Sequence, residues 1–134
     1  MHDPNEYLAI PGVLDALRAL QKRQLALGIV TSRTRRETQA FLNQFGLRGV
    51  FKAVVTYEDV PRLKPHPLPV RTAANMLGVP PGQCVLVGDS SADVRAARAA
   101  GVLAVGVLSG LGETQDFSDA DLVLKSPAQL PAWL

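Results

Sequence analysis

The sequence has 134 residues, of which 47% are hydrophobic and 19% are charged. This balance fits one folded domain over residues 1–134 and excludes an intrinsically disordered chain. The formal net charge is +2, and basic residues cluster only at Arg33, Arg35 and Arg36, so the sequence lacks a nucleic-acid-binding footprint. No apolar stretch is long enough to cross a bilayer, and Cys84 is the only cysteine. We therefore expect a cytoplasmic protein whose partners include neither nucleic acid nor membrane.

Helix and strand patterns alternate along the chain after an entry segment, 1–10, that has no clear period. A helix follows Pro11-Gly12, and Thr34 with Glu37 forms a capping box that starts a second helix, which ends before Gly46. Apolar runs bounded by turn residues predict the strands. The further predicted elements are strands at 25–30, 51–56, 84–87, 103–107 and 121–124, helices at 68–77 and 91–100, a polar loop at 109–118 and a helical turn at 127–134.

This order predicts an α/β fold built on a doubly wound, mostly parallel sheet with right-handed crossovers. Such sheets bind ligands at the carboxyl ends of their strands. Polar residues that suit chemistry fall at these ends or in an adjoining loop. They are Thr31 with Ser32, Lys64, and Asp89 with Asp93.

Asp89 follows a predicted strand, and Asp93 lies in the first turn of the helix after it. Two carboxylates at this edge suit Mg²⁺, which prefers oxygen ligands and keeps waters and a substrate phosphate as its other ligands. An alternative is that Ser90 caps the helix and Asp93 completes a capping box, and for Asp93 alone this interpretation is simpler. The pair together with Gly88 favours the metal site.

The other two candidates would complete a phosphate site. Thr31 and the amides near Ser32 can donate to phosphate oxygens, Lys64 can neutralise their charge, and Mg²⁺ can bridge phosphate to protein. Each also has a simpler interpretation, because Thr31 and Ser32 could only begin the next helix and Lys64 could be a solvated surface charge. Pro65 restricts the backbone of Lys64. His66 is interpreted as a surface residue rather than an acid, a base or a ligand.

Three motifs in this order resemble those of a known family: Ile29-Val30-Thr31-Ser32, Lys64-Pro65-His66-Pro67 and Gly88-Asp89-Ser90-Ser91-Ala92-Asp93. They are similar to the second, third and fourth motifs of the haloacid dehalogenase superfamily, most of all its phosphoglycolate phosphatase-like branch, and the resemblance covers residues 11–134. It implies a Rossmann-like core that hydrolyses a small phosphorylated metabolite. It also implies that Thr31 binds phosphate, that Lys64 stabilises phosphate and nucleophile, and that Asp89 and Asp93 hold Mg²⁺. Lys64 and Asp89 would then be catalytic.

The resemblance has one large departure. Members of the superfamily begin with a strand that ends in Asp-x-Asp, followed by a helical cap domain, and neither has a counterpart in this sequence. The first Asp of that motif is the nucleophile, so we expect the chain alone to be inactive. The missing central strand would lie between the strands that end at Thr31 and Asp89. We expect the two unpaired edges to be filled by a homodimer partner, by a complementing N-terminal segment or by residues 7–10.

The departure leaves several interpretations open. The sequence could be a fragment or a late-assigned start of a normal phosphatase, one half of a split enzyme, or a non-catalytic phosphate-binding or interaction module. A receiver-like signalling domain also combines acidic residues, a Thr or Ser and a Lys on a doubly wound sheet. In that class the acidic pair comes first, whereas here Thr31 precedes Lys64 and the pair Asp89 and Asp93 comes last.

Overall fold

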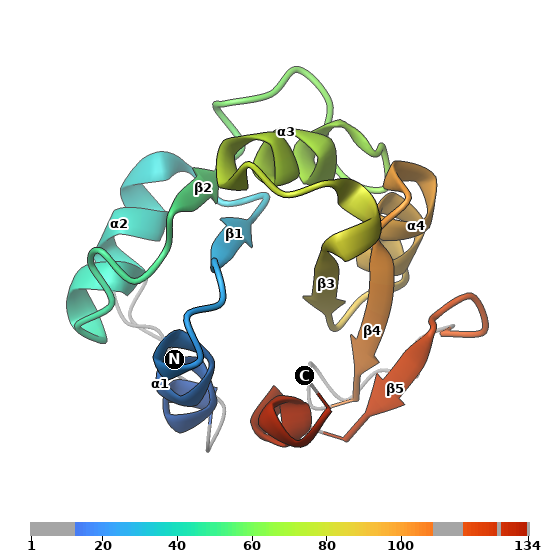
Figure 1. The fold of residues 1–134 in the computed structure, drawn as a ribbon. Helices are drawn as coiled ribbons and strands as arrows, with labels where there is room; N and C mark the ends of the chain where they lie inside the picture. Colours follow the sequence, from blue (N-terminus) through green and yellow to red (C-terminus); the bar gives the residue numbers. More distant parts are fainter. Residues whose placement is uncertain (1–12, 109–116, 126, 134) are drawn as a thin grey trace, which may run out of the picture.

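The computed structural model describes residues 13–108, 117–125 and 127–133, in which helices alternate with short strands (Figure 1). The predicted entry segment 1–10 and most of the predicted loop 109–118 lie outside the described residues. None of the helices described here is long and apolar enough to cross a membrane. The helices are α1 (Val13–Lys22), α2 (Arg35–Gln44), α3 (Leu68–Leu77), α4 (Ser91–Ala100) and the short 3-10 helices η1 (Pro81–Gln83) and η2 (Pro127–Ala132). The strands are β1 (Gly28–Val30), β2 (Ala53–Val55), β3 (Val85–Gly88), β4 (Leu103–Val107) and β5 (Leu122–Leu124).

The described strands form two parallel sheets, which confirms the predicted α/β class. In one sheet β1 pairs with β2, placing Gly28 opposite Ala53. The other has the order β3-β4-β5 and places Val85 opposite Leu103. Within the described ranges, β1 and β3 therefore pair on one side only. The sheet is interrupted at the place where the sequence predicted a missing strand.

Helices and polar contacts connect the two sheets. Helix α3 contacts β1, β2 and α4, and so spans the β1-β2 sheet and the helix that covers β3 and β4 (Figure 1). Helix α1 contacts η2, and Nη1 of Arg23 donates to the carbonyl oxygen of Pro131 at 3.0 Å. These contacts hold the two sheets next to each other although no described strand joins them.

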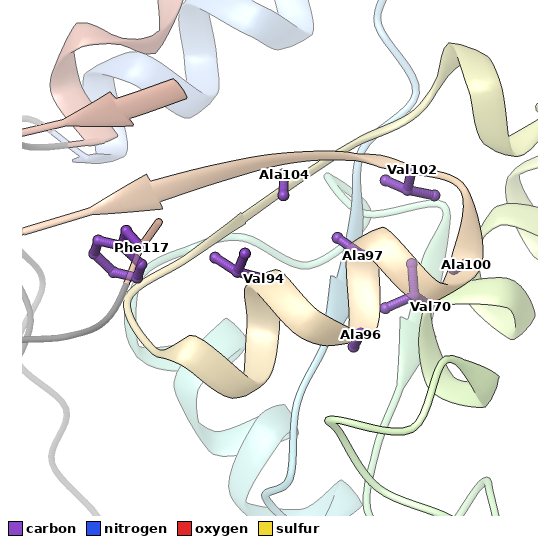
Figure 2. Close-up of a cluster of buried hydrophobic side chains, with 8 residues drawn as sticks. All are labelled: Val70, Val94, Ala96, Ala97, Ala100, Val102, Ala104 and Phe117. Atoms are coloured by element: carbon purple, nitrogen blue, oxygen red, sulfur yellow. The ribbon is translucent and has the colours of Figure 1, made fainter. Parts of the chain in front are cut away.

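The larger hydrophobic cluster lies around α4 (Figure 2). Ala96 and Ala97 are fully buried, and these small side chains let α4 approach its neighbours closely. Phe117, near the end of the loop predicted at 109–118, lies in no helix or strand, and its side chain is buried in the same cluster. The Phe117 ring lies against the backbone of Gly106, where an added Cβ would come within 2.8 Å of it.

The element boundaries follow local chemistry. The predicted helix 68–77 is observed without change, and Gly78 ends it in the left-handed conformation at φ +70°. The strand predicted at 25–30 begins only at Gly28. Gln24 takes up a positive φ of 60° after α1, and Leu25 is 43% exposed, so the chain is still turning where the apolar run begins.

Candidate active site

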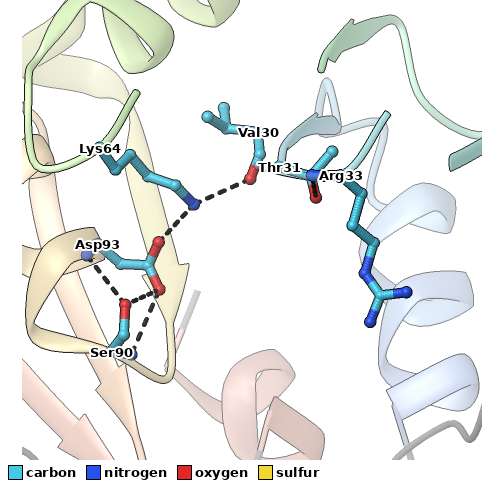
Figure 3. Close-up of polar contacts among 6 residues, drawn as sticks. All are labelled: Val30, Thr31, Arg33, Lys64, Ser90 and Asp93. Atoms are coloured by element: carbon cyan, nitrogen blue, oxygen red, sulfur yellow. Dashed lines mark hydrogen bonds and ion pairs between the residues drawn. The ribbon is translucent and has the colours of Figure 1, made fainter. Parts of the chain in front are cut away.

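Lys64 joins the ends of the two sheets. Its Nζ donates to the carbonyl oxygen of Val30 at 3.1 Å and to Oδ1 of Asp93 at 2.5 Å. The side chains of Lys64 and Asp93 are only 14% and 11% exposed, so the ion pair is largely shielded from water. Figure 3 shows the ammonium group between the carboxylate and the carbonyl. The structure thus brings two of the predicted site residues into direct contact across the break in the sheet.

Asp93 also completes a capping box at the start of α4. Its Oδ2 accepts hydrogen bonds from the backbone N–H of Ser90 at 3.3 Å and from the Ser90 hydroxyl at 2.9 Å. The Ser90 hydroxyl in turn accepts from the backbone N–H of Asp93 at 3.3 Å (Figure 3). The capping interpretation of Asp93 is therefore confirmed, and one carboxylate both caps α4 and pairs with Lys64.

Gly88 is needed because of where Asp93 lies. A Cβ built on Gly88 would come within 2.3 Å of the Cβ and Oδ2 atoms of Asp93. Real Cβ atoms do not approach so closely, so the Asp93 side chain rests directly on the backbone at the end of β3. The spacing Gly88-x₄-Asp93 thus has a steric reason that is independent of any metal.

Asp89 follows β3 and is exposed to solvent. Among the residues that the structure describes, no group of three or more His, Cys, Asp or Glu side chains is placed to hold a metal ion. Asp89 and Asp93 nevertheless offer the oxygen ligands that Mg²⁺ prefers, with water and phosphate left to supply the rest. Oδ1 of Asp93 is already paired with the Lys64 ammonium group, so Mg²⁺ at this oxygen would share or replace that contact. By the type of their ligand atoms the two carboxylates fit Mg²⁺, and the role of both residues stays a prediction.

Thr31 and Ser32 form the turn between β1 and α2. The backbone N–H of Thr31 donates to the carbonyl oxygen of Val55 at 2.9 Å, and its Oγ1 accepts from the backbone N–H of Arg33 at 3.1 Å. Thr31 is half-buried and Ser32 is exposed. Figure 3 shows that the guanidinium group of Arg33 points away from Lys64. Thr31 directly follows Val30, whose carbonyl oxygen Lys64 contacts, so the turn lies beside the ammonium group.

Residues 1–107 match the family model described as haloacid dehalogenase-like hydrolase. The chain belongs to this family. It is 38% identical over 118 residues to a phosphoglycolate phosphatase of Escherichia coli K12, which covers 87% of this chain and 47% of that protein. It is 40% identical over 122 residues to the pyrophosphatase PpaX of Bacillus pumilus, which covers 90% of this chain and 56% of that protein.

Solved structures of the haloacid dehalogenase-like hydrolases share the fold. The crystal structure of CbbY from Rhodobacter sphaeroides in complex with phosphate aligns with a TM-score of 0.83 at 28% identity, covering 90% of this chain and 55% of that one. The predicted Rossmann-like family core is therefore confirmed. The chain spans about half the length of the curated relatives that it matches.

Two residues of this haloacid dehalogenase-like chain differ from their sequence interpretation. His66, predicted to lie at the surface, is half-buried, and its Nδ1 accepts from the backbone N–H of Leu68 at 3.1 Å at the start of α3. That donor occupies one ring nitrogen, and the interpretation that His66 is not an acid, a base or a ligand stays a prediction. Cys84, predicted to begin the strand at 84–87, directly precedes β3. It is half-buried against the α4 cluster, and burial raises the pKa of its thiol.

The sequence analysis did not identify Asp59 as a residue that orders its surroundings. Oδ2 of Asp59 accepts from the backbone N–H and the hydroxyl of Thr56, each at 2.7 Å, and Thr56 is fully buried. These hydrogen bonds, with the nearby Arg35 guanidinium, lower the pKa of the Asp59 carboxyl. The spacing of Thr56 and Asp59 is that of the two capping boxes, Thr34 with Glu37 and Ser90 with Asp93. This repeated three-residue spacing was the signal that could have found it.

Proposed function

We propose that this chain supplies the phosphate-binding and metal-binding part of a Mg²⁺-dependent phosphatase that hydrolyses a small phosphate monoester. The observation that carries the proposal is the position of Lys64, whose Nζ bridges the carbonyl oxygen of Val30 and the carboxylate of Asp93. This contact links the end of β1, directly before Thr31, to Asp93 in the first turn of α4. Membership of the haloacid dehalogenase-like hydrolases supports the same chemistry.

In this proposal the chain's own residues bind and neutralise the phosphate. The Thr31 hydroxyl and the backbone N–H of Ser32 would donate to two phosphate oxygens, since the neighbouring N–H groups of Thr31 and Arg33 already donate within the protein, and Lys64 would donate to a third. The ammonium group of Lys64 carries three N–H donors, and Val30 and Asp93 use two of them here, which leaves one for a substrate oxygen. Because the Lys64 side chain is only 14% exposed, its ammonium group stabilises negative charge more strongly than it would at an exposed surface.

Asp89 and Asp93 would hold Mg²⁺ in the proposed enzyme. When bound, the cation would neutralise phosphate oxygens and orient the phosphoryl group for attack. Oδ1 of Asp93 faces Lys64 and Oδ2 faces Ser90, so Asp93 stays oriented by its capping bonds whichever cation its Oδ1 meets. Asp89, which is exposed, is the more accessible of the two carboxylates.

The nucleophile is proposed to come from a strand that pairs between β1 and β3. In the described residues no third carboxylate joins Asp89 and Asp93. The unpaired edges of β1 and β3 offer backbone hydrogen-bonding groups to such a strand. A complementing N-terminal segment is the proposed source of this strand and its nucleophile. The partner of a homodimer is the alternative occupant of the open edges, but as a copy of the same sequence it would bring no Asp-x-Asp motif. We further propose a cytoplasmic protein that acts on a small phosphorylated metabolite, with the names of the relatives directing the choice to phosphoglycolate and pyrophosphate.

The test joins to the chain an upstream segment that carries an Asp-x-Asp strand and a cap, which gives the restored protein. Phosphate release is then measured from phosphoglycolate, from a wider panel of phosphate monoesters and from the anhydride pyrophosphate. We expect Mg²⁺-dependent hydrolysis by the restored protein and none by the 134-residue chain. Lys64→Ala and Asp89→Ala should each lower kcat/KM by about 10²–10³-fold. Asp119→Asn, a change of an exposed carboxyl, is the matched control and should leave the rate unchanged.

Inactivity of the restored protein across the whole panel would contradict a phosphatase. It would favour the second candidate, a non-catalytic phosphate-binding module. That candidate has its own support, because Asp93 already has a structural role through the capping box and the ion pair with Lys64. If the restored protein binds phosphate but hydrolyses none of the substrates, the binding module is favoured over the phosphatase.

A further inference from the structure

The loop after β2 forms hydrogen bonds and an ion pair with the turn that leads into α2. The backbone N–H of Tyr57 donates to the carbonyl oxygen of Arg33 at 2.9 Å. The backbone N–H of Arg35 donates to Oε1 of Glu58 at 2.8 Å, and the Arg35 guanidinium forms an ion pair with Oδ1 of Asp59. Three consecutive residues of this loop thus hold the segment that begins two residues after Thr31.

Asp59 is the point where these contacts converge. Its Oδ2 accepts two hydrogen bonds from Thr56, which is fully buried and directly follows β2, and its Oδ1 accepts from Arg35. One carboxylate therefore ties the rigid end of β2 to the first residue of α2. The charged form accepts all of these bonds, and the pKa of the carboxyl is lowered accordingly.

The segment 33–35, which the loop after β2 holds, sets the geometry of residues 31–33. The backbone N–H of Arg33 donates to Oγ1 of Thr31, and the carbonyl oxygen of the same residue accepts from Tyr57. A shift of Arg33 would therefore reorient the Thr31 hydroxyl. We propose that Asp59 is a positioning residue for the phosphate-binding turn formed by Thr31, Ser32 and Arg33. The inference rests on the proposed function, because that proposal makes the turn a phosphate site.

Because the ion pair between Arg35 and Asp59 is partly exposed, a positioning role can be distinguished from a purely structural one. The side chains of Arg35 and Asp59 are 48% and 28% exposed, and pairs of this kind contribute little to global stability. Loss of the pair should therefore change the geometry of the turn and leave the core intact. Binding of phosphate should respond more strongly than resistance to unfolding.

The experiment uses the full 134-residue chain labelled with ¹⁵N. Inorganic phosphate is titrated in the presence of Mg²⁺ while NMR follows the amides of Thr31, Ser32 and Arg33. We expect Asp59→Asn and Arg35→Gln to raise the apparent Kd about 10-fold, the usual cost of losing a residue that orients a ligand-binding group. Arg35→Lys should recover part of the loss, and the control Asp119→Asn should match the wild type.

Hydrogen exchange without phosphate provides a second readout that does not depend on the proposed function. The amides of Arg33 and Tyr57 should exchange several-fold faster in Asp59→Asn and Arg35→Gln. The amide of Val102, which donates to the carbonyl oxygen of Ala97 at 2.9 Å in the other half of the molecule, should be unchanged. Because Arg35→Gln leaves the Thr56 and Asp59 hydrogen bonds in place, it serves if Asp59→Asn does not fold.

The outcomes are distinguishable. Unchanged exchange at Arg33 and Tyr57 in Arg35→Gln, or unchanged phosphate affinity in both variants, overturns the positioning role. A wild-type chain in which phosphate shifts none of the three turn amides contradicts the proposed function instead. In that case the exchange rates still decide whether Asp59 holds the turn.

Discussion

Replacement of Gly88 by alanine tests how the end of β3 and the start of α4 fit together. The added Cβ would lie 2.3 Å from the Cβ and Oδ2 atoms of Asp93, so either the Asp93 side chain or the backbone must move. Movement of Asp93 would break the capping box with Ser90, at a cost of about 0.5–2 kcal/mol. It would also leave Lys64 without its shielded partner, at a cost of about 1–3 kcal/mol.

Alanine also lowers the conformational entropy of the unfolded chain relative to glycine, and this stabilising effect offsets about 0.4–1 kcal/mol of the cost. We therefore expect Gly88→Ala to lower the free energy of unfolding by about 2–3 kcal/mol. For a chain of 134 residues this corresponds to a fall in Tm of about 7–11 °C, taking about 2.1 cal/mol/K of unfolding entropy per residue.

Thermal and urea unfolding followed by circular dichroism, at one protein concentration, measure the difference. Gly82→Ala is the matched control, because a Cβ there meets nothing within 4 Å. Its Tm should stay within about 2 °C of the wild type, as expected for a surface change without strain. A Gly88→Ala protein as stable as Gly82→Ala would refute the close approach of Asp93 to β3.

Three further predictions concern single groups. Thr34→Ala removes the capping box of α2 and should lower the free energy of unfolding by about 1 kcal/mol in urea, whereas an unchanged value would contradict the box. The lowered pKa of Asp59 stabilises the fold above about pH 4, the unfolded pKa, and this contribution is lost as the pH falls through the folded pKa. The difference in unfolding free energy between the wild type and Asp59→Asn should accordingly shrink between pH 6 and pH 3, and a constant difference would contradict the ionised carboxylate. The raised pKa of Cys84 predicts slower alkylation by iodoacetamide at pH 8 in the folded chain than in urea, and equal rates would show that the thiol is not shielded.

Local patterns in the sequence were enough to predict much of the fold. The Thr34 and Ser90 capping boxes and the helix at 68–77 depend on neighbours within a few residues, and all are observed. The alternation of helices and strands was enough to predict a parallel α/β arrangement. The break between the strands that end near Thr31 and Asp89 followed only from the resemblance to the haloacid dehalogenase superfamily. Strand ends were less predictable, because Leu25 belongs to an apolar run and yet faces solvent.

Contacts between distant parts of the chain could not be predicted from such patterns. The sequence placed Lys64 and Asp93 in one site but did not indicate that they form an ion pair, since 29 residues separate them. The packing of Phe117 on Gly106 and the link between Asp59 and Arg35 depend in the same way on tertiary placement. His66 was misjudged because its acceptor role depends on the backbone direction at the start of α3.

In the proposed function, residues from both sheets form one phosphate and metal site around Lys64. NMR titration of the chain with Mg²⁺ and inorganic phosphate together tests whether the site is shared. We expect the amides of Thr31, Ser32, Asp89 and Asp93 to shift with one common apparent Kd, and we expect Asp89→Asn to weaken all four responses. Shifts confined to one sheet, or a response at Thr31 that Asp89→Asn leaves unchanged, would contradict a shared site.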